Sequence, residues 1–568
     1  MKKLLVYLAD YKKESIFGPL FKLLEASFEL LVPLVVAAII DTGIKNNDFG
    51  YILKMCLILV GLALIGMVCA ITAQFFAAKA AVGFSAKLRS ALFRHIQSLS
   101  HSETDSLGLS TLITRITSDI NQVQAGVNLF LRLLLRSPFV VIGAMVMAFF
   151  IDARCAMIFV GVIPVLAIVV FGIMLITMPM YKNSQKQLDI ITRKTRENIT
   201  GARVIRAFGL EEKETEEFSA INSVLVGIQK FAGKISALMN PVTYIIINIA
   251  VIALIYSGAV KVELGQLKQG EVVALYNYMS QILVELVKMA NMIITITKAV
   301  ACSNRIADVF EIKNSLVNGN KKEGTDSSVA VEFENASFCY NGSSEMAVEN
   351  LTFKANQGDI IGIIGGTASG KTSLVNLIPR FYDVSEGTVR VEGVDVREYD
   401  IHSLRRKIGF VHQKAVLFKG TIESNLKLGN QNAEQADIET ALEAAQIIDS
   451  VKEKGGTGAV CEQNGRNFSG GQKQRLTIAR ALVKKPEILI LDDSASALDY
   501  ITESKLRNAI AELGYNPTVF IVSQRASSVM HADKIIVLDD GKAVGIGTHT
   551  QLLESCETYK EIYSSQFE

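Results

Sequence analysis

Residues 365–372 read Gly365-Gly366-Thr367-Ala368-Ser369-Gly370-Lys371-Thr372. This stretch follows an apolar, β-branched run that ends at Ile364, and it precedes a helix-forming run that begins at Ser373. A strand, a glycine-rich loop and a helix in this order are typical of a phosphate-binding loop. Glycines let main-chain N–H groups converge on anionic oxygens, and the start of the helix adds its positive dipole end. The sequence therefore predicts that phosphate groups bind here.

Two side chains of this loop indicate how a nucleoside triphosphate and its metal would be held. The Lys371 ammonium can reach the β- and γ-phosphates, and the Thr372 hydroxyl can ligate Mg²⁺. The same pattern also arises by chance, so its meaning depends on the other motifs in the chain.

The composition excludes several classes of protein. A chain of 568 residues is too long for one domain and is expected to hold roughly two to four. The net charge of +2 creates no field that favours nucleic acid, so no such partner is expected. The seven cysteines are scattered without a C-x-x-C pair, which favours reduced packing residues over a metal site or a disulfide framework.

The first half of the chain contains apolar stretches long enough to cross a hydrocarbon layer of about 30 Å. Six are found, near residues 16–42, 51–76, 128–150, 155–180, 239–260 and 271–298. The last is interrupted by Asn277, Glu285 and Lys288. Soluble buried helices can mimic one or two such stretches but not six at this spacing. We therefore expect a multi-pass protein of the cell membrane, which in a bacterium is the inner or plasma membrane.

The segments between these stretches alternate in length. Those at 43–50, 151–154 and 261–270 are short, whereas those at 77–127 and 181–238 are long, polar and rich in Lys and Arg. Because positive charge marks the cytoplasmic side, both termini and both long segments are expected in the cytosol. Their helical periodicity predicts that the membrane helices continue beyond the bilayer.

Further motifs accompany the phosphate loop in a fixed order. They are Tyr340 in Ser337-Phe338-Cys339-Tyr340, Gln413 in Val411-His412-Gln413, Ser469-Gly470-Gly471-Gln472, Ile488-Leu489-Ile490-Leu491-Asp492 and Ser496-Ala497-Leu498-Asp499. With these motifs the whole chain resembles the ATP-binding cassette (ABC) transporters, in the half-transporter form of the exporter type. The tetrad 469–472 discriminates best, because ordinary phosphate-loop ATPases lack it.

The resemblance implies an α-helical membrane domain of six transmembrane helices with long cytoplasmic extensions, followed by an α/β ABC-type nucleotide-binding domain of the P-loop NTPase class. The expected boundaries are 1–310 for the membrane domain, 311–328 for a linker and 329–568 for the cytoplasmic nucleotide-binding domain. The run at 314–328 is polar and contains glycines, as in a linker. From Val329 on, strands and helices alternate, which indicates a largely parallel sheet.

The resemblance also assigns expected roles to individual residues. Tyr340 would stack on adenine, and the phosphates would contact Gly365, Gly366, Thr367, Ala368, Ser369, Gly370, Lys371, Thr372 and Ser373. The γ-phosphate of ATP on a facing chain would contact Ser469, Gly470, Gly471 and Gln472. Mg²⁺ would be held by Thr372, Gln413 and Asp492, and the loop 496–499 would cross the dimer interface. The positions of the catalytic groups are those of Asp493, Gln524 and Gln413.

Two of these positions depart from the family pattern. Asp493 stands where the family usually has Glu as the general base, so its carboxylate is expected about 1.5 Å further from the attacking water. Gln524 stands where the family usually has the switch His, and an amide can donate an N–H but cannot become a cation. Together they predict that ATP at this chain's own loop is held and hydrolysed slowly.

This combination resembles the degenerate-site subunit of heterodimeric multidrug exporters. A non-identical half-transporter is then the expected partner, and tetrad 469–472 would complete that partner's competent site. The alternative is neutral drift in a homodimer that hydrolyses ATP at a reduced rate. An importer or a regulatory subunit built on the same fold is also open.

The membrane half offers further expectations. Residues 98–108 and the region 181–238 resemble the coupling regions, in which a short transverse helix seats in a nucleotide-binding domain. Export of amphipathic small molecules or drugs is what the resemblance implies for transport. Within the spans, two pairs lie one helical turn apart, Glu25 with Glu29 and Arg132 with Arg136. One interpretation is that the carboxylates face a cavity that suits a cationic amphiphile. The other, which is favoured, is that Glu and Arg pair between helices or lie in the cytoplasmic extensions where water reaches them.

Overall fold

The structure is a computed structural model that describes residues 2–325, 328–494, 496 and 498–567. The chain forms two compact units. One contains the residues up to Gln97 together with Ser110–Ile312, and the other contains Ser98–Leu109 together with the chain from Lys313 onward. A short piece of the first half therefore folds with the second half.

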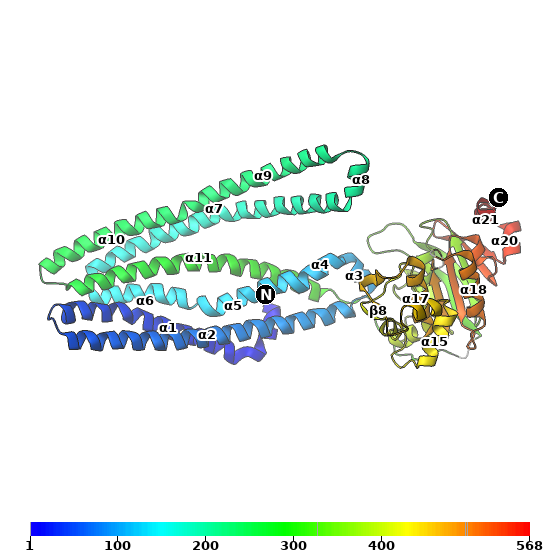
Figure 1. Ribbon diagram of the computed structural model, residues 1–568, viewed down its shortest axis with the longest axis horizontal. Coiled ribbons are helices and arrows are strands. Elements are labelled where there is room, and N and C mark those ends of the chain that lie inside the picture. The colour runs from blue at the N-terminus through cyan, green and yellow to red at the C-terminus, as the bar shows by residue number, and fades with distance from the viewer. Residues whose placement is uncertain (1, 326–327, 495, 497, 568) are drawn as a thin grey trace. The chain divides into compact units, whose positions relative to one another are not determined.

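The first unit is entirely helical (Figure 1). Its elements are η1 (Lys2–Tyr11), α1 (Lys12–Ala38), η2 (Ile39–Ile44), α2 (Phe49–Ser98), α4 (Leu109–Thr114), η3 (Arg115–Asp119), α5 (Ile120–Leu133), α6 (Arg136–Ile151), α7 (Ala153–Thr200), α8 (Ala202–Ala207), α9 (Glu211–Ala237), α10 (Met239–Glu263) and α11 (Gln269–Glu311). Among the described residues six helical segments are long and apolar enough to cross a membrane, and each contains one predicted stretch. The prediction of six spans is confirmed.

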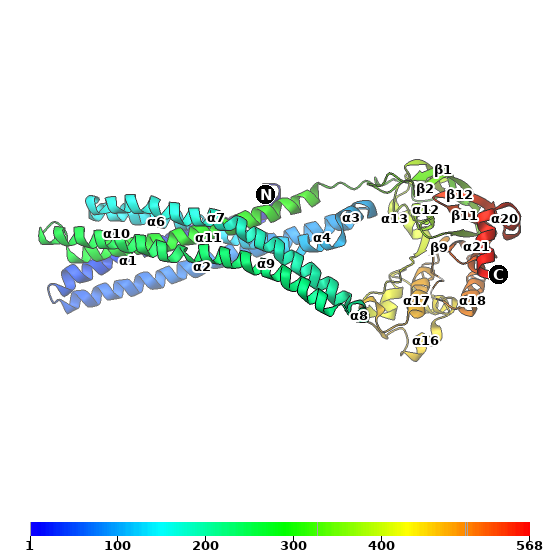
Figure 2. The ribbon, with the colours of Figure 1, turned by 90° about the horizontal axis from the view of Figure 1, so that it is seen from above.

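Small residues let these helices approach closely. Ala26 of α1, Ala144 and Ala148 of α6 and Ala274 of α11 are fully buried in one apolar core. Without water between helices, such contacts supply the packing that holds a membrane bundle together. The hairpin of α7 and α9, joined by α8, diverges from the other helices of this unit in both views (Figures 1 and 2).

Three helices of this unit meet at a buried ion cluster. The Arg136 guanidinium at the start of α6 contacts the Glu285 carboxylate of α11 at 2.5 Å and the Glu29 carboxylate of α1 at 2.6 Å. Lys288 lies 2.9 Å from Glu285, and Ser137 donates a hydrogen bond to it. Only 3% of the Glu285 side chain is exposed. The pairing of Glu29 with Arg136 between helices agrees with the favoured interpretation.

The second unit is built on three sheets. Its strands are β1 (Val329–Phe338), β2 (Val348–Asn356), β3 (Ile360–Gly365), β4 (Glu386–Val391), β5 (Val394–Asp395), β6 (Ile408–Val411), β7 (Gly420–Thr421), β8 (Val460–Cys461), β9 (Ile488–Asp492), β10 (Thr518–Ser523), β11 (Lys534–Asp539) and β12 (Lys542–Gly547). The six-stranded sheet has the order β12-β11-β3-β10-β9-β6 and is parallel except at β12. This is the predicted largely parallel sheet.

A second sheet, with the order β2-β1-β4-β5, is antiparallel and was not predicted. One buried core joins residues of both sheets, for example Phe333 of β1 with Ile363 of β3 and Phe520 of β10. The pair β7 and β8 forms a third, two-stranded sheet.

Short helices surround these sheets (Figure 2). They are α12 (Lys371–Leu377), α13 (Ile401–Lys407), α14 (Ile422–Leu426), α15 (Gln435–Ala444), α16 (Ile448–Glu453), η4 (Gln463–Gly465), α17 (Gly470–Leu482), α18 (Tyr500–Ala511), α19 (Ala526–Val529), α20 (His549–Ser555) and α21 (Glu557–Phe567). A separate apolar core forms around α14, α15 and α17, with Leu426, Leu442 and Ile478 buried.

The predicted first coupling region contains a short helix, α3 (His101–Leu107), that packs on this unit. The His101 ring of this helix packs against the Phe381 ring, with 4.6 Å between their centroids. The Tyr382 hydroxyl donates to Asp105 at 2.7 Å. A capping box between Ser100 and Glu103 starts the helix, as the sequence of these residues favours.

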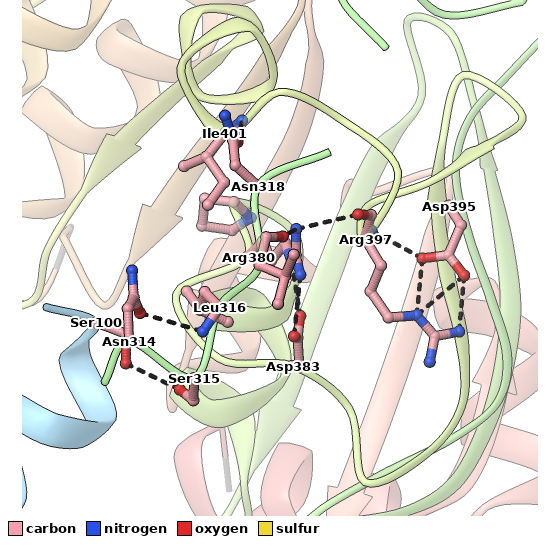
Figure 3. A network of polar contacts seen from close by, with 12 residues as sticks. Ser100, Asn314, Ser315, Leu316, Asn318, Arg380, Asp383, Asp395, Arg397 and Ile401 are labelled. Carbon is pink, nitrogen blue, oxygen red and sulfur yellow. Dashed lines mark hydrogen bonds and ion pairs between the residues drawn. The ribbon is translucent and has the colours of Figure 1, made fainter. Parts of the chain in front are cut away.

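The predicted linker has almost no regular structure after α11, but its described residues are tied to their surroundings (Figure 3). The Asn314 amide donates to the main chain of Ser98, and the buried Arg380 guanidinium donates to the carbonyl of Val317 at 3.0 Å. Arg380 also forms an ion pair with Asp383. The residues Asp326 and Ser327 of the predicted linker lie outside the described residues.

Candidate functional site

The predicted site residues converge because three parallel strands end at the same edge of the sheet. Strand β3 leads into the glycine-rich loop, β9 ends at Asp492, and β10 ends one residue before Gln524. Strand β10 lies between β3 and β9, so the three carboxyl ends are adjacent. Ligands of such sheets bind at these ends.

At two positions of the glycine-rich loop, the backbone leaves no room for a Cβ atom. Gly370 has φ +92°, and a Cβ there would collide with the carbonyl oxygen of Ala347. A Cβ on Gly365 would collide with the carbonyl oxygen of Leu538. The loop thus lies close to other main-chain segments, and these glycines are required for that approach.

Lys371 is the first residue of α12 and is buried. Its ammonium donates to the carbonyl of Gly365 at 2.8 Å, to the carbonyl of Gly366, and to the Ser369 hydroxyl at 3.2 Å. Burial lowers the pKa of Lys371, although the nearby carboxylates of Asp493 and Asp492 oppose this.

Asp492 accepts a hydrogen bond from the Thr372 hydroxyl at 3.0 Å. Burial raises the pKa of Asp492, because the surroundings penalise its charged form more than Thr372 and Lys371 stabilise it. A cation placed beside this carboxylate would reverse that penalty. The pair therefore presents two oxygen ligands next to the phosphate loop.

Asp493 has φ +45°, a left-handed conformation that Asp tolerates better than most residues. Its carboxylate accepts a hydrogen bond from the Gln413 amide at 3.1 Å. The structure thus brings Gln413 and Asp493 into direct contact, and this hydrogen bond uses one N–H of Gln413 and one oxygen of Asp493.

A cavity of about 360 Å³ collects most of the predicted residues. Its lining includes Tyr340, the loop 367–370, Lys371, Thr372, Ser373, Gln413, Asp492, Asp493 and Gln524. The Tyr340 hydroxyl lies 3.0 Å from the Ser373 hydroxyl, and 37% of the Tyr340 side chain is exposed. One cavity is thus lined by an exposed aromatic ring, a lysine and two carboxylates, the residue types that would contact a base, phosphates and a metal ion.

The tetrad Ser469-Gly470-Gly471-Gln472 lies elsewhere, at the exposed start of α17. Ser469 caps this helix: its hydroxyl accepts from the N–H of Gln472 at 3.3 Å, and the Gln472 side chain returns a bond to the Ser469 N–H. Within the described part of the chain, none of these four residues lines the cavity. The predicted residue Ala497 lies outside the described residues.

Comparison with known proteins places the chain. The profile of the ABC transporter transmembrane region matches residues 15–286, and the ABC transporter profile matches residues 348–496. An uncharacterised ABC transporter ATP-binding protein of Mycobacterium tuberculosis is 35% identical over 564 residues, which cover 99% of this chain and 97% of that protein. The chain belongs to the ABC transporter family.

Two further relatives describe the transporter more closely. An ATP-dependent lipid A-core flippase of Vibrio vulnificus is 27% identical over 572 residues, covering 100% of the transporter chain and 97% of the flippase. The solved structure of a bacterial Atm1-family ABC exporter with ATP bound shares the fold, with a TM-score of 0.81 and 21% identity over 98% of this chain and 99% of that chain. The fold is that of an ABC exporter.

Membership in the family confirms the main expectations. The transporter is a multi-pass membrane protein with an ATP-binding, cytoplasmic nucleotide-binding domain, and it couples ATP hydrolysis to transport. The resemblance to half-transporters drawn from the motifs is thereby supported along the whole chain.

Two residues of the site were not predicted. Tyr382 packs edge-on against Tyr340 at 5.3 Å between ring centroids while it bonds Asp105 of α3. Burial, together with the Asp105 hydrogen bond, raises the pKa of its hydroxyl. The side-chain amide of Gln566 in α21 donates a hydrogen bond to the carbonyl oxygen of Gln524. Neither residue belongs to a motif, and their partners are distant in sequence, so no local signal points to them.

Proposed function

We propose that the transporter exports amphipathic small molecules, lipid-like compounds or drugs, as one half of a dimer with a second, non-identical half. In this proposal ATP is held at the chain's own phosphate loop and hydrolysed slowly there. The tetrad Ser469-Gly470-Gly471-Gln472 completes the competent site of the partner. Domain closure then moves the membrane helices between inward- and outward-facing states.

One observation carries the asymmetry. The carboxylate of Asp493, already one methylene short, is engaged by the Gln413 amide. A general base must lie within hydrogen-bond reach of the water it deprotonates, and a misplacement of about 1 Å can forfeit most of its effect. By contrast, the capping box of Ser469 and Gln472 forms a complete helix start whose first residues, Ser469 and Gly470, are exposed, as contact with a facing phosphate would need.

The oxygen ligands at the pocket fit a bound Mg²⁺. Thr372, Asp492 and Gln413 offer a hydroxyl, a carboxylate and an amide oxygen, which is the donor set that this hard cation prefers. Mg²⁺ would neutralise phosphate oxygens and relieve the burial of the Asp492 charge. Lys371 would orient the β- and γ-phosphates, Tyr340 the adenine ring, and Gln524 would donate an N–H to the terminal phosphate.

Dimerisation is supported by the second coupling region, which contains α8 between α7 and α9. Apolar side chains in and next to this helix are exposed, with 59% of Val204 and 75% of Phe208 open to solvent. Exposed apolar groups on a short helix favour docking on another surface. The family resemblance makes that surface the nucleotide-binding domain of the partner.

Two observations bear on the substrate. The flippase relative is named for lipid A-core, an amphipathic molecule. In the membrane unit Glu29 is neutralised by Arg136 and Glu25 lies 2.5 Å from Lys22, so neither is a free carboxylate that would select cations. Both favour a substrate recognised by its apolar part rather than by positive charge.

A turnover measurement tests the asymmetry. The chain purified alone is expected to hydrolyse little ATP. With the second half, recovered by co-purification, turnover is expected to appear and to be abolished by Ser469→Arg in this chain. Brisk hydrolysis by the isolated chain, dependent on Asp493, would instead support a homodimer.

Transport in inside-out vesicles separates the other functional classes. ATP-driven accumulation of a lipophilic dye supports export, whereas ATP-driven loss of preloaded dye supports import. Equal flux with ATP and with a non-hydrolysable analogue would identify a gated, regulatory protein, because binding alone would then be sufficient.

A further inference from the structure

The C-terminal helix α21 reaches the loop that carries Gln524 (Figure 2 shows α21, in red, beside β11). The Gln566 side-chain amide donates from Nε2 to the carbonyl oxygen of Gln524 at 2.8 Å. Its Oε1 accepts from the N–H of Ala526, also at 2.8 Å. The Gln566 amide is therefore hydrogen-bonded to the main chain on both sides of Arg525.

Both of these main-chain groups lie at the ends of their elements. Gln524 follows the last residue of β10, and Ala526 is the first residue of α19, whose N-cap residue Arg525 offers no side-chain hydrogen bond. Groups at such ends have no partner within their own element. A primary amide has both an acceptor oxygen and an N–H donor, so it can pair with the Ala526 N–H and the Gln524 carbonyl at the same time.

The helix that supplies Gln566 is anchored without it. Tyr559 of α21 is fully buried in a core with Ala526, Val529 and Leu552. Its hydroxyl lies 2.7 Å from the His549 ring nitrogen. Gln566, by contrast, sits on the exposed part of the helix, so its replacement is expected to leave α21 in place.

We propose that Gln566 is a positioning residue for nucleotide at this chain's own loop: it fixes the turn 524–526 so that the Gln524 amide reaches the terminal phosphate. The inference rests on the proposed function, in which Gln524 contacts that phosphate. Gln524 lines the cavity, so a shift of its main chain changes where its side chain ends. Gln566 itself lines no part of the cavity among the described residues.

The test compares two nucleotides on the full-length protein in lipid nanodiscs. Dissociation of a non-hydrolysable ATP analogue and of ADP, each carrying a fluorescent label on the ribose, is followed in the presence of Mg²⁺. Gln566→Ala is expected to speed release of the triphosphate analogue about fivefold to tenfold, the effect of losing two hydrogen bonds that act through Gln524. Release of ADP is expected to change less than about twofold, because ADP lacks the phosphate in question.

Three companion variants sharpen the result. Gln566→Glu keeps the acceptor for Ala526 but loses the donor to Gln524, and is expected to resemble Gln566→Ala. Ser565→Ala, on the same exposed stretch of α21, is expected to behave as wild type. In a Gln524→Ala background, Gln566→Ala is expected to add nothing, since the residue through which it acts is already gone.

Each alternative outcome overturns the inference. Equal acceleration for both nucleotides would mean that Gln566 only supports the fold, as would an effect that persists in the Gln524→Ala background. Unchanged release of the triphosphate analogue would mean that the turn is held without Gln566. Failure of the proposed slow site appears separately, as brisk ATP turnover by the wild-type chain, and leaves the comparison of triphosphate with ADP intact.

Discussion

Two clusters of charged side chains, one in the membrane unit and one in the nucleotide pocket, are built on opposite plans. In the membrane unit, Arg136 lies between the carboxylates of Glu29 and Glu285, and Lys288 also pairs with Glu285, so two positive and two negative charges balance. In the pocket, Lys371 is held by carbonyl and hydroxyl oxygens and Asp492 by a hydroxyl. A cavity of about 360 Å³ lies beside them.

The difference leads us to propose a different role for each cluster. Charges that satisfy one another bind helices together and leave little to offer a ligand. In the pocket, the hydrogen-bond partners of Lys371 and Asp492 are neutral, and the carboxylates near Lys371 only partly offset its burial, so both charges can still attract an incoming ion. The pKa shifts in the pocket agree with this interpretation, because burial lowers the pKa of Lys371 and raises that of Asp492. Bound phosphate and Mg²⁺ would each restore the charged form that burial disfavours.

The largest effect is expected from breaking the membrane cluster. Arg136→Leu leaves Glu285 buried with only Lys288 and Ser137 as partners. Removing one member of a buried ion pair typically costs about 3–5 kcal/mol of folding free energy. We expect a clearly lower midpoint of thermal unfolding for the purified protein, with unchanged affinity for ATP.

The matched control removes both charges. The double variant Arg136→Leu with Glu285→Leu is expected to regain most of the lost stability, because a well-packed apolar pair can replace a buried ion pair. Glu29, whose side chain is 41% exposed, can remain hydrated. If the single and double variants were equally unstable, packing around Arg136 rather than charge would explain the loss.

The opposite pattern is expected in the pocket. Lys371→Ala removes the cation expected to contact two phosphates, and charge-assisted hydrogen bonds are worth about 1.5–3 kcal/mol. We expect ATP affinity to fall by about 100-fold while the unfolding midpoint stays the same, as measured by equilibrium binding and thermal unfolding on one preparation. A large loss of stability in this variant would contradict the view that the pocket charges await a ligand.

How far the sequence alone could go differs between these two regions. In the pocket, the motifs of Lys371, Asp492 and Gln413 can be recognised along the chain, and the family resemblance implies that they share one site. The structure gives the physical reason, since the parallel strands that precede these residues end at one edge of the sheet. In the membrane unit, Glu285 only weakens the apolar signal of its span. Its partner Arg136 lies 149 positions away, and no pattern in one sequence joins them. Helical spacing places Arg136 on a face but does not identify what that face contacts.

The antiparallel sheet β2-β1-β4-β5 and the contact of Tyr382 with Asp105 were missed for related reasons, although a short docking helix was expected within residues 98–108. The sheet is assembled from strands interrupted by the phosphate loop and α12, so no simple hairpin pattern covers all four. The contact between Tyr382 and Asp105 spans 277 positions and involves residue types that are common on any surface. Such contacts depend on tertiary packing rather than on local preference.

Lengthening the carboxylate of the pocket tests its slow chemistry. Asp493→Glu moves the carboxylate forward by about 1.5 Å, one bond length. We expect the ATP turnover of the isolated chain to rise by about tenfold, a part of the usual general-base effect, since Gln524 still replaces the switch His. The left-handed backbone at this position costs Glu somewhat more than Asp, which limits the gain.

The control for this variant is Asp493→Asn, which keeps the size of the side chain and removes its basicity. Turnover of the isolated chain is expected to fall only slightly, because the carboxylate contributes little where it stands. Complete loss in Asp493→Asn, with no gain in Asp493→Glu, would make Asp493 a competent base.

The smallest effect is expected at the contact between Tyr382 of the nucleotide-binding domain and Asp105 of α3. The Tyr382 hydroxyl donates to the Asp105 carboxylate at 2.7 Å, so one partner is charged and the other is neutral. No opposite charge is involved. Tyr382→Phe removes the hydroxyl but keeps the ring that packs on Tyr340. Because solvent exposure weakens this hydrogen bond, we expect it to contribute about 1 kcal/mol and substrate-stimulated ATP turnover of the assembled transporter to drop about fivefold in the variant. ATP affinity is expected to stay constant, because the pocket itself is unchanged.

The variant Tyr382→Leu also removes the ring and is expected to lower ATP affinity as well. If both substitutions reduced affinity equally, the hydroxyl of Tyr382 would serve the adenine platform rather than the contact with α3.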